Sequence, residues 1–177
     1  MSIAFVSDLH LEPIENKKVK VFFQFLNNAV YKYEELYILG DFFEYWIGDD
    51  DIQPANKLIM QTLKTASDNG LKIYFIHGNR DFLVGSGFES ETGVKILSDQ
   101  HTFNIGEKKI MISHGDAFCV DDVEYQEMKR KIRSDSWKKD FLIKSISERV
   151  DFANDLRTKS AKRNSNKPEN IMDVNDN

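Results

Sequence analysis

The chain has 177 residues, of which 41% are hydrophobic and 30% are charged, and its formal net charge is −5. This length suits one domain with a buried core, and the composition excludes an intrinsically disordered chain. The single cysteine, Cys119, excludes an intrachain disulfide framework and a cysteine-based zinc cluster, and it favours a reducing compartment.

The sequence shows neither a signal-peptide pattern nor a membrane-spanning one. An acidic residue and a histidine occur by residue 10, within MSIAFVSDLH, so we expect no signal-peptide core. No apolar run approaches the ~20 residues that cross a bilayer. We therefore predict a cytoplasmic protein.

Apolar runs and helical spacings alternate along the chain. The apolar runs predict strands at Ile3–Val6, Leu36–Leu39, Lys72–Ile76 and Val94–Leu97, followed by a hairpin of Thr102–Ile105 with Lys109–Ser113. Hydrophobic residues three and four apart predict helices from Val19 to Val30 and from Pro54 to Ala66, the second capped by Asn69-Gly70. Strands that alternate with helices predict an α/β fold.

The net charge conceals an asymmetry. The segment from Met128 to Lys167 carries 13 lysines and arginines against 5 acidic residues, and the rest of the chain carries 11 against 24. The acidic part should repel nucleic acid and attract metal ions, so we expect no nucleic-acid partner. The basic segment should attract phosphates or an anionic surface.

Polar groups follow four of the predicted strands. The four sets are Asp8-x-His10, Gly40-Asp41, Gly78-Asn79-Arg80-Asp81 and His114-Gly115-Asp116. In α/β sheets the ligand site lies beyond the carboxyl ends of the strands, so these side chains can converge. Imidazoles, carboxylates and an amide can each present a lone pair to a cation. The pattern therefore predicts a metal site.

Less specific interpretations stay open for single residues. Each set taken alone is also typical of a turn, and Asp41 could be a helix N-cap. We interpret His77 as a buried structural histidine and His101 as a loop residue without a role. Asp49-Asp50-Asp51 is interpreted as a solvated acidic loop, because three successive carboxylates cannot all face one ion. Cys119 is interpreted as a packing residue.

Five stretches carry a resemblance to a known family: SDLHLEP, YILGDFFEYWIGDDD, YFIHGNRDFL, HGDAFCVDD and SNKPENIMDVN. They resemble the calcineurin-like metallophosphoesterase family, and within it the lipid A pathway branch that acts on UDP-2,3-diacylglucosamine. The resemblance runs from Ile3 to Asn175. It implies a sandwich of two β-sheets flanked by helices, as a single domain over 1–177 without the closing C-terminal strands. It also implies a basic helical cap over the active site at roughly 122–168.

The same resemblance implies a site with two Mn²⁺ ions. Asp8 and His10 would bind one ion, Asn79 and His114 the second, and Asp41 would bridge them. Arg80 would pair with phosphate oxygens, and its alternative is a salt bridge to Asp81. The catalytic residues implied are Asp41, Asn79, Arg80 and His114. The substrate contacts implied are Asn79, Arg80, Asp122, Ser160, Asn164 and Lys167.

The activity implied is hydrolysis of the pyrophosphate bond of UDP-2,3-diacylglucosamine by water attack at the UMP-side phosphorus. The products are UMP and 2,3-diacylglucosamine 1-phosphate. The ligand types alone admit manganese, iron, zinc or cobalt, and manganese comes from the family. Another metallophosphoesterase, acting on phosphomonoesters or nucleotides, is the alternative within the enzyme class, and YWIGDDD and SNKPEN argue against it.

The basic segment also contains a possible apolar stripe. Its members are Trp137, Phe141, Leu142, Ile146 and Val150, interleaved with Lys138, Lys139, Lys144 and Arg149. A basic amphipathic helix is typical of a membrane surface or partner site, but also of an ordinary helix with a solvated basic face. The resemblance favours a cap that shelters acyl chains and contacts the inner membrane peripherally. Nothing in the sequence indicates an oligomeric state.

One feature departs from the family. Relatives carry a Gly-His-x-His motif beyond the IMDVN stretch, and its histidines complete the ligands of both ions. This sequence has four histidines, and none is left to substitute for them. Each ion is expected to keep three protein ligands, with Asp41 counted twice. We therefore expect either a fragment of a longer hydrolase, or a short product with weak or no activity that binds lipid or nucleotide.

Overall fold

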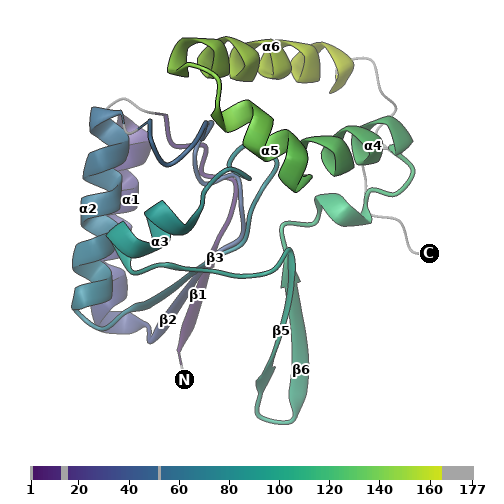
Figure 1. Ribbon diagram of the computed structural model, residues 1–177. Helices are drawn as coiled ribbons and strands as arrows, with labels where there is room; N and C mark the ends of the chain where they lie inside the picture. The colour runs from purple at the N-terminus through teal and green to yellow at the C-terminus, as the bar shows by residue number, and fades with distance from the viewer. Residues whose placement is uncertain (1, 13–15, 52, 165–177) are drawn as a thin grey trace. The chain divides into compact units, whose positions relative to one another are not determined.

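A computed structural model describes residues 2–12, 16–51 and 53–164, without the side chains of 161–164. The chain forms two compact units, Met1–His114 and Gly115–Asn177. The first contains both β-sheets, and the elements of the second are helical (Figure 1). None of the helices in the described ranges is long and apolar enough to span a bilayer.

A parallel sheet forms the centre of the first unit. Its strands are hydrogen-bonded in chain order: β1 (Ile3–Val6), β2 (Glu35–Ile38), β3 (Lys72–Phe75) and β4 (Lys95–Ile96). The pairing aligns Val6 with Ile38 and Ile38 with Phe75, so these three strands end at the same edge of the sheet. The predicted strands are confirmed to within one residue at each end.

Helices α1 (Lys17–Lys32) and α2 (Pro54–Asp68) lie side by side on one face of this sheet (Figure 1). The Asn16 side chain accepts a hydrogen bond from the Val19 N–H and caps the start of α1. Helix α2 has a proline in its first turn and is capped at its C-terminus by Asn69, with Gly70 at φ +96°, as predicted. A third helix, α3 (Ser86–Thr92), was not predicted.

The two faces of the sheet are buried by different elements. Leu36 and Ile38 are fully buried on the helical side, where Phe42 packs edge-on against Phe22 with ring centroids 5.0 Å apart. Tyr37 points to the opposite face, because side chains alternate along a strand. There it stacks on Phe103 of a hairpin, β5 (Gln100–Ile105) and β6 (Lys108–Ser113), at 5.2 Å. This hairpin confirms the second predicted sheet.

The second unit consists of a 3₁₀ turn, η1 (Asp116–Phe118), and helices α4 (Val123–Ile132), α5 (Asp135–Leu142) and α6 (Ile146–Asn164). The predicted apolar stripe is interrupted, because the chain leaves the helix between Leu142 and Ile146. Leu142 is 41% exposed, and Arg149 is buried rather than solvated. The aromatic contacts join Trp137 and Phe141 of α5 to Phe152 of α6.

An ionic network anchors η1 to α4. The Asp116 carboxylate accepts hydrogen bonds from the Tyr125 hydroxyl at 2.6 Å and from Lys129 Nζ at 2.9 Å, and Arg133 lies 3.7 Å away. Burial acts to raise the pKa of Asp116, but the Tyr125 hydrogen bond and the two cations outweigh it and lower the pKa below its ordinary value. The position of this unit as a cap over the active site remains a prediction.

Candidate metal centre

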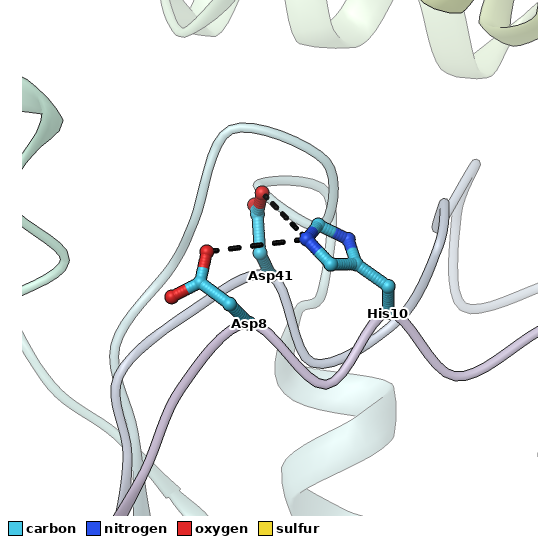
Figure 2. Close-up of side chains that lie close together, drawn as sticks. All are labelled: Asp8, His10 and Asp41. Atoms are coloured by element: carbon cyan, nitrogen blue, oxygen red, sulfur yellow. Dashed lines mark ion pairs between the residues drawn. The ribbon is translucent and has the colours of Figure 1, made fainter. Parts of the chain in front are cut away.

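The segments that follow β1 and β2 bring Asp8, His10 and Asp41 together (Figure 2). The two segments stay paired beyond the sheet, since the His10 N–H donates to the Asp41 carbonyl at 2.9 Å. The three residues have φ values of 55°, 47° and 49°, in the left-handed region. Each such residue costs roughly 1–2 kcal/mol, and strain of this kind clusters at functional sites.

The distances within this group suit a cation. His10 Nε2 lies 3.9 Å from Asp8 Oδ1 and 4.0 Å from Asp41 Oδ2. These separations are too long for hydrogen bonds. Ligand atoms that each sit about 2.1 Å from a shared ion lie roughly 3–4 Å from one another. The three side chains are therefore spaced as ligands of one ion would be.

The two oxygens of Asp41 face two different imidazoles. Oδ2 faces His10, and Oδ1 lies 3.8 Å from His114 Nε2. His114 Nδ1 donates a hydrogen bond to the Leu39 carbonyl at 2.8 Å, which leaves the lone pair on Nε2, toward Asp41. Burial raises the pKa of Asp41, and His114, His10 and Arg80 only partly oppose the rise. A cation at this position would favour the carboxylate form.

Two glycines allow the loops around Asp41 to approach each other. A Cβ atom on Gly78 would lie 2.2 Å from both the backbone nitrogen and Oδ1 of Asp41. One on Gly40 would lie 2.5 Å from the Gly78 nitrogen. Neither position can hold a side chain without a shift of backbone. The next turn contributes a further contact, because the Arg80 N–H donates to Asp41 Oδ1 at 3.0 Å.

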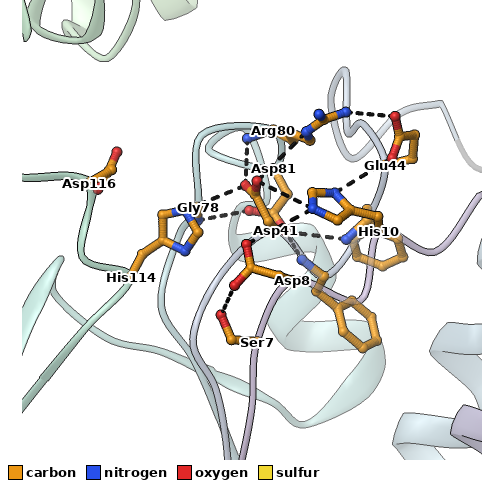
Figure 3. A network of polar contacts seen from close by, with 12 residues as sticks. Ser7, Asp8, His10, Asp41, Glu44, Gly78, Arg80, Asp81, His114 and Asp116 are labelled. Atoms are coloured by element: carbon orange, nitrogen blue, oxygen red, sulfur yellow. Dashed lines mark hydrogen bonds and ion pairs between the residues drawn. The ribbon is translucent and has the colours of Figure 1, made fainter. Parts of the chain in front are cut away.

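Asp81 holds these two loops together, a role that the sequence did not reveal. Its side chain is fully buried and accepts hydrogen bonds from the N–H groups of Gly78 at 2.8 Å, Phe42 at 2.7 Å and Phe43 at 3.3 Å (Figure 3). Burial, together with the neighbouring Asp41 charge, raises the pKa of Asp81 to about 6. Its carboxylate is a structural clamp on the loops rather than the predicted alternative partner of Arg80.

Arg80 pairs with Glu44 instead. Its Nη1 atom lies 2.6 Å from Glu44 Oε1, and its Nε atom lies 3.7 Å from Asp41 Oδ2. The second oxygen of Glu44 lies 3.5 Å from His10 Nδ1 (Figure 3). Glu44 is 9% exposed, and no pattern in the sequence singled it out. It lies six residues after the end of β2, within the run YILGDFFEYWIGDDD, where the resemblance gave it no role.

The other predicted site residues lie in different settings. Asn79 is exposed, between Gly78 and Arg80, which both contact Asp41. Asp122 belongs to the second unit, where its carboxylate caps α4 by accepting the Tyr125 N–H at 3.1 Å. Ser160 is exposed on α6. Asn164 ends α6, and its side chain and the whole of Lys167 lie outside the described residues.

The two remaining histidines are not part of this group. His77 Nε2 donates a hydrogen bond to the Val84 carbonyl at 2.7 Å, which confirms its structural interpretation, although its side chain is only partly buried. His101 lies in β5 and not in a loop, and its ring lies against Phe103.

The interpretation of the acidic run as a solvated loop was wrong for Asp49. Its carboxylate accepts the Trp46 indole N–H at 2.9 Å and three backbone N–H groups at the start of α3, those of Gly85, Gly87 and Phe88. Free N–H groups at a helix N-terminus favour a carboxylate partner, and this explains why Asp49 is only partly exposed. Asp50 is exposed, as expected.

The donor set fits a divalent cation. Carboxylate oxygens and imidazole nitrogens are ligands for manganese, iron or zinc. His10 Nδ1 is buried and has no hydrogen-bond partner among the described residues, while Nε2 faces two carboxylates. The four side chains that converge here, Asp8, His10, Asp41 and His114, can hold cations and, with Arg80 beside them, an anionic substrate.

Comparison with known proteins agrees with this chemistry. Residues 1–169 match the family described as calcineurin-like phosphoesterase. A UDP-2,3-diacylglucosamine hydrolase from Haemophilus influenzae (strain ATCC 51907 / DSM 11121 / KW20 / Rd) is 40% identical over 171 residues, which cover 97% of this chain and 72% of that protein. One from Yersinia pseudotuberculosis (serotype O:1b, strain IP 31758) is 41% identical, with 99% and 73% covered.

Among solved structures, a phosphoesterase from E. coli is similar at 18% identity and a TM-score of 0.41, over 67% of this chain and 59% of that one. The family and the two curated relatives confirm the resemblance found in the sequence, and with it a metal-dependent hydrolase. The chain belongs to the calcineurin-like phosphoesterase family and, within it, groups with the UDP-2,3-diacylglucosamine hydrolases.

Proposed function

We propose that this protein hydrolyses the pyrophosphate bond of UDP-2,3-diacylglucosamine with two Mn²⁺ ions, giving UMP and 2,3-diacylglucosamine 1-phosphate. The name shared by its curated relatives supports the substrate. The single observation that best supports the chemistry is the Asp41 carboxylate, whose oxygens face His10 and His114 at 4.0 and 3.8 Å.

The proposed ligand assignment comes from the family resemblance, and the contacts of Asp41 with His10 and His114 support it. Asp8 and His10 would hold one ion, Asn79 and His114 would hold the other, and Asp41 would be shared between the two. A carboxylate can be shared in this way because each of its oxygens offers lone pairs. When bound, a pair of divalent ions lowers the pKa of a water molecule and neutralises charge that develops on the phosphoryl oxygens.

The chain's own residues orient the substrate. Arg80 has a side chain that is 34% exposed, so its guanidinium can reach a ligand while Glu44 holds one side of it. A guanidinium fork suits two phosphate oxygens. His114 is held by its hydrogen bond to the Leu39 carbonyl, so its Nε2 atom keeps one direction. Asn79 presents an exposed amide next to this pair.

The second unit is proposed to hold the lipid and sugar parts of the substrate, through Asp122, Ser160, Asn164 and Lys167. Asp122 caps the start of α4 by accepting the Tyr125 N–H. Exposed apolar side chains support peripheral contact with the inner-membrane surface, since Ile143 is 82% exposed beside Lys144. Co-sedimentation with anionic liposomes tests this part, and no binding at low salt would remove it.

Hydrolysis in ¹⁸O-labelled water tests the proposed reaction. The 177-residue chain is incubated with MnCl₂ and UDP-2,3-diacylglucosamine, and both products are analysed by mass spectrometry. The proposal expects one ¹⁸O atom in UMP and none in the lipid phosphate. Label in the lipid phosphate would contradict attack at the UMP-side phosphorus. Substrate binding without any UMP would instead favour a non-catalytic binder of lipid or nucleotide.

Variants link the activity to the site. Arg80→Ala should lower kcat/KM by about 10²–10³-fold, because a charged donor that faces the developing phosphoryl charge is lost. Lys64→Ala is the matched control, since Lys64 pairs with Asp68 on the surface of α2. Equal activities of the two variants would remove Arg80 from the proposed mechanism.

A further inference from the structure

We infer that Glu44 is a positioning residue, which fixes the His10 imidazole and the Arg80 guanidinium at the same time. This inference rests on the proposed metal site, because its consequence is the direction of the His10 lone pair. Glu44 lies within the YILGDFFEYWIGDDD run, but neither the metal-site motifs nor the family resemblance gave it a role.

Each oxygen of Glu44 serves a different partner. Oε1 lies 2.6 Å from Arg80 Nη1, and Oε2 lies 3.5 Å from His10 Nδ1 (Figure 3). The carboxylate is 10% exposed, so little water competes for these contacts. Glu44 therefore joins the residue proposed to bind a metal to the residue proposed to bind a phosphate.

The backbone holds Glu44 in register with both partners. Its N–H donates to the Leu11 carbonyl at 2.9 Å, next to His10 in the chain. The Trp46 N–H, two residues further on, donates to the Arg80 carbonyl at 3.1 Å. These bonds tie the short segment between Asp41 and Trp46 to the chain on either side of it. The backbone at Glu44 is therefore held in place between the segments that carry His10 and Arg80.

The chemical consequence is a defined tautomer of His10. A carboxylate beside Nδ1 favours the proton on that nitrogen, and the lone pair then lies on Nε2. His10 Nε2 is the atom that faces Asp8 and Asp41. The other imidazole of the site is arranged in the same way, because the Leu39 carbonyl accepts the His114 Nδ1 proton. The Glu44 oxygen lies farther from its imidazole, at 3.5 Å against 2.8 Å, so it acts on His10 Nδ1 through its charge and not through a formed hydrogen bond.

A purely structural ion pair between Glu44 and Arg80 is the competing explanation. It predicts lower stability without Glu44 but an unchanged affinity for metal. The two explanations are separated by Glu44→Gln, which keeps the size of the side chain but offers only one acceptor oxygen. Glu35→Gln is the matched control, because Glu35 is similarly buried, with a side chain 12% exposed, and lies 3.8 Å from Lys72 Nζ. Glu35 begins β2, at the end of the strand away from the site.

The first readout is Mn²⁺ affinity, followed as the loss of free-ion EPR signal on titration. Glu44→Gln should weaken binding about 10–100-fold, whereas Glu35→Gln should leave it within about twofold of the wild type. A Glu44→Gln affinity also within about twofold of the wild type would overturn the inference.

The second readout needs no Glu44 variant. In the metal-free wild-type chain, ¹⁵N NMR of the imidazole nitrogens reports which atom of His10 carries the proton, with assignment by the missing signals of His10→Gln. The inference expects the proton on Nδ1, and a proton on Nε2 would overturn it even if Glu44→Gln fails to fold. If the wild type binds no Mn²⁺, the proposed function fails, whereas the tautomer still tests the hold of Glu44 on His10.

Discussion

Replacement of Asp81 by asparagine is the most informative perturbation of the loops that carry the site. The native carboxylate is fully buried and accepts three backbone N–H groups. Asparagine has nearly the same size, but its NH₂ group must face one of those donors. The lost hydrogen bond should cost about 1–3 kcal/mol. The buried charge is removed at the same time, and its effect depends on pH.

The magnitude of this second effect follows from the pKa. Burial raises the pKa of Asp81 from 3.8 to about 6, and a shift of this size corresponds to about 3 kcal/mol. Because the folded state binds the proton more tightly than the unfolded state, this contribution to stability is fully present below pH ~4 and is lost as the pH rises through about 6. In the wild type, the free energy of unfolding should therefore fall between these pH values. Asp81→Asn should lack this part of the slope.

Urea unfolding of the metal-free chain, in a chelator and at several pH values between about 4 and 7, measures this difference. Asp68→Asn is the control, because Asp68 is an exposed carboxylate at the end of α2. It should keep the wild-type slope. Parallel pH profiles of the wild type and Asp81→Asn would refute the reasoning that burial controls this carboxyl group.

Three further predictions concern other contacts of the fold. Asp49→Ala should lower the free energy of unfolding by about 2–4 kcal/mol, because the start of α3 and the Trp46 indole lose their acceptor. Urea unfolding measures this loss, and a value under about 1 kcal/mol would contradict the stabilising role of Asp49. Gly78→Ala should abolish Mn²⁺ binding, because the added Cβ would lie 2.2 Å from Asp41 Oδ1. Gly106→Ala is the control and should bind Mn²⁺ normally, because its Cβ meets open space. Equal EPR titrations of the two variants would argue against the close approach of Gly78 to Asp41. Asp116→Asn should destabilise the chain at neutral pH. It should also reduce the loss of stability on acidification, because the lowered pKa of Asp116 makes its stabilising contribution disappear as the pH falls. Thermal unfolding measures both effects, and an unchanged acid profile would contradict the prediction.

Much of the first unit could be predicted from its sequence, because local patterns there agree with the tertiary structure. Short apolar runs that end in a polar pair gave the strands, and the common direction of parallel strands places those pairs at one edge. This is why Asp8, His10 and Asp41 converge as expected, whereas His114 follows β6 of the antiparallel hairpin and is held near Asp41 by its hydrogen bond to the Leu39 carbonyl. The spacing of Val19 and its helical neighbours sufficed for α1, since one face of that helix is buried.

The roles of Asp81, Glu44 and Asp49 could not be predicted. Each carboxylate has at least one partner that is 36 or more residues away in the chain, so these contacts are decided by how the loops pack. The break between α5 and α6 differs, because a local signal was present. Ser145 and Glu148 cap each other, with the Ser145 N–H donating to Glu148 Oε2 at 2.9 Å, and this spacing is typical of a helix start. The continuous apolar spacing concealed it.

EPR spectroscopy of the Mn²⁺-loaded chain tests the central claim most directly. If Asp41 bridges two ions, the loaded protein should hold two Mn²⁺ per chain with an exchange-coupled spectrum, and Asp41→Asn should abolish the coupling. A single Mn²⁺ per chain with an uncoupled six-line spectrum, unchanged in Asp41→Asn, would contradict the proposed two-metal site.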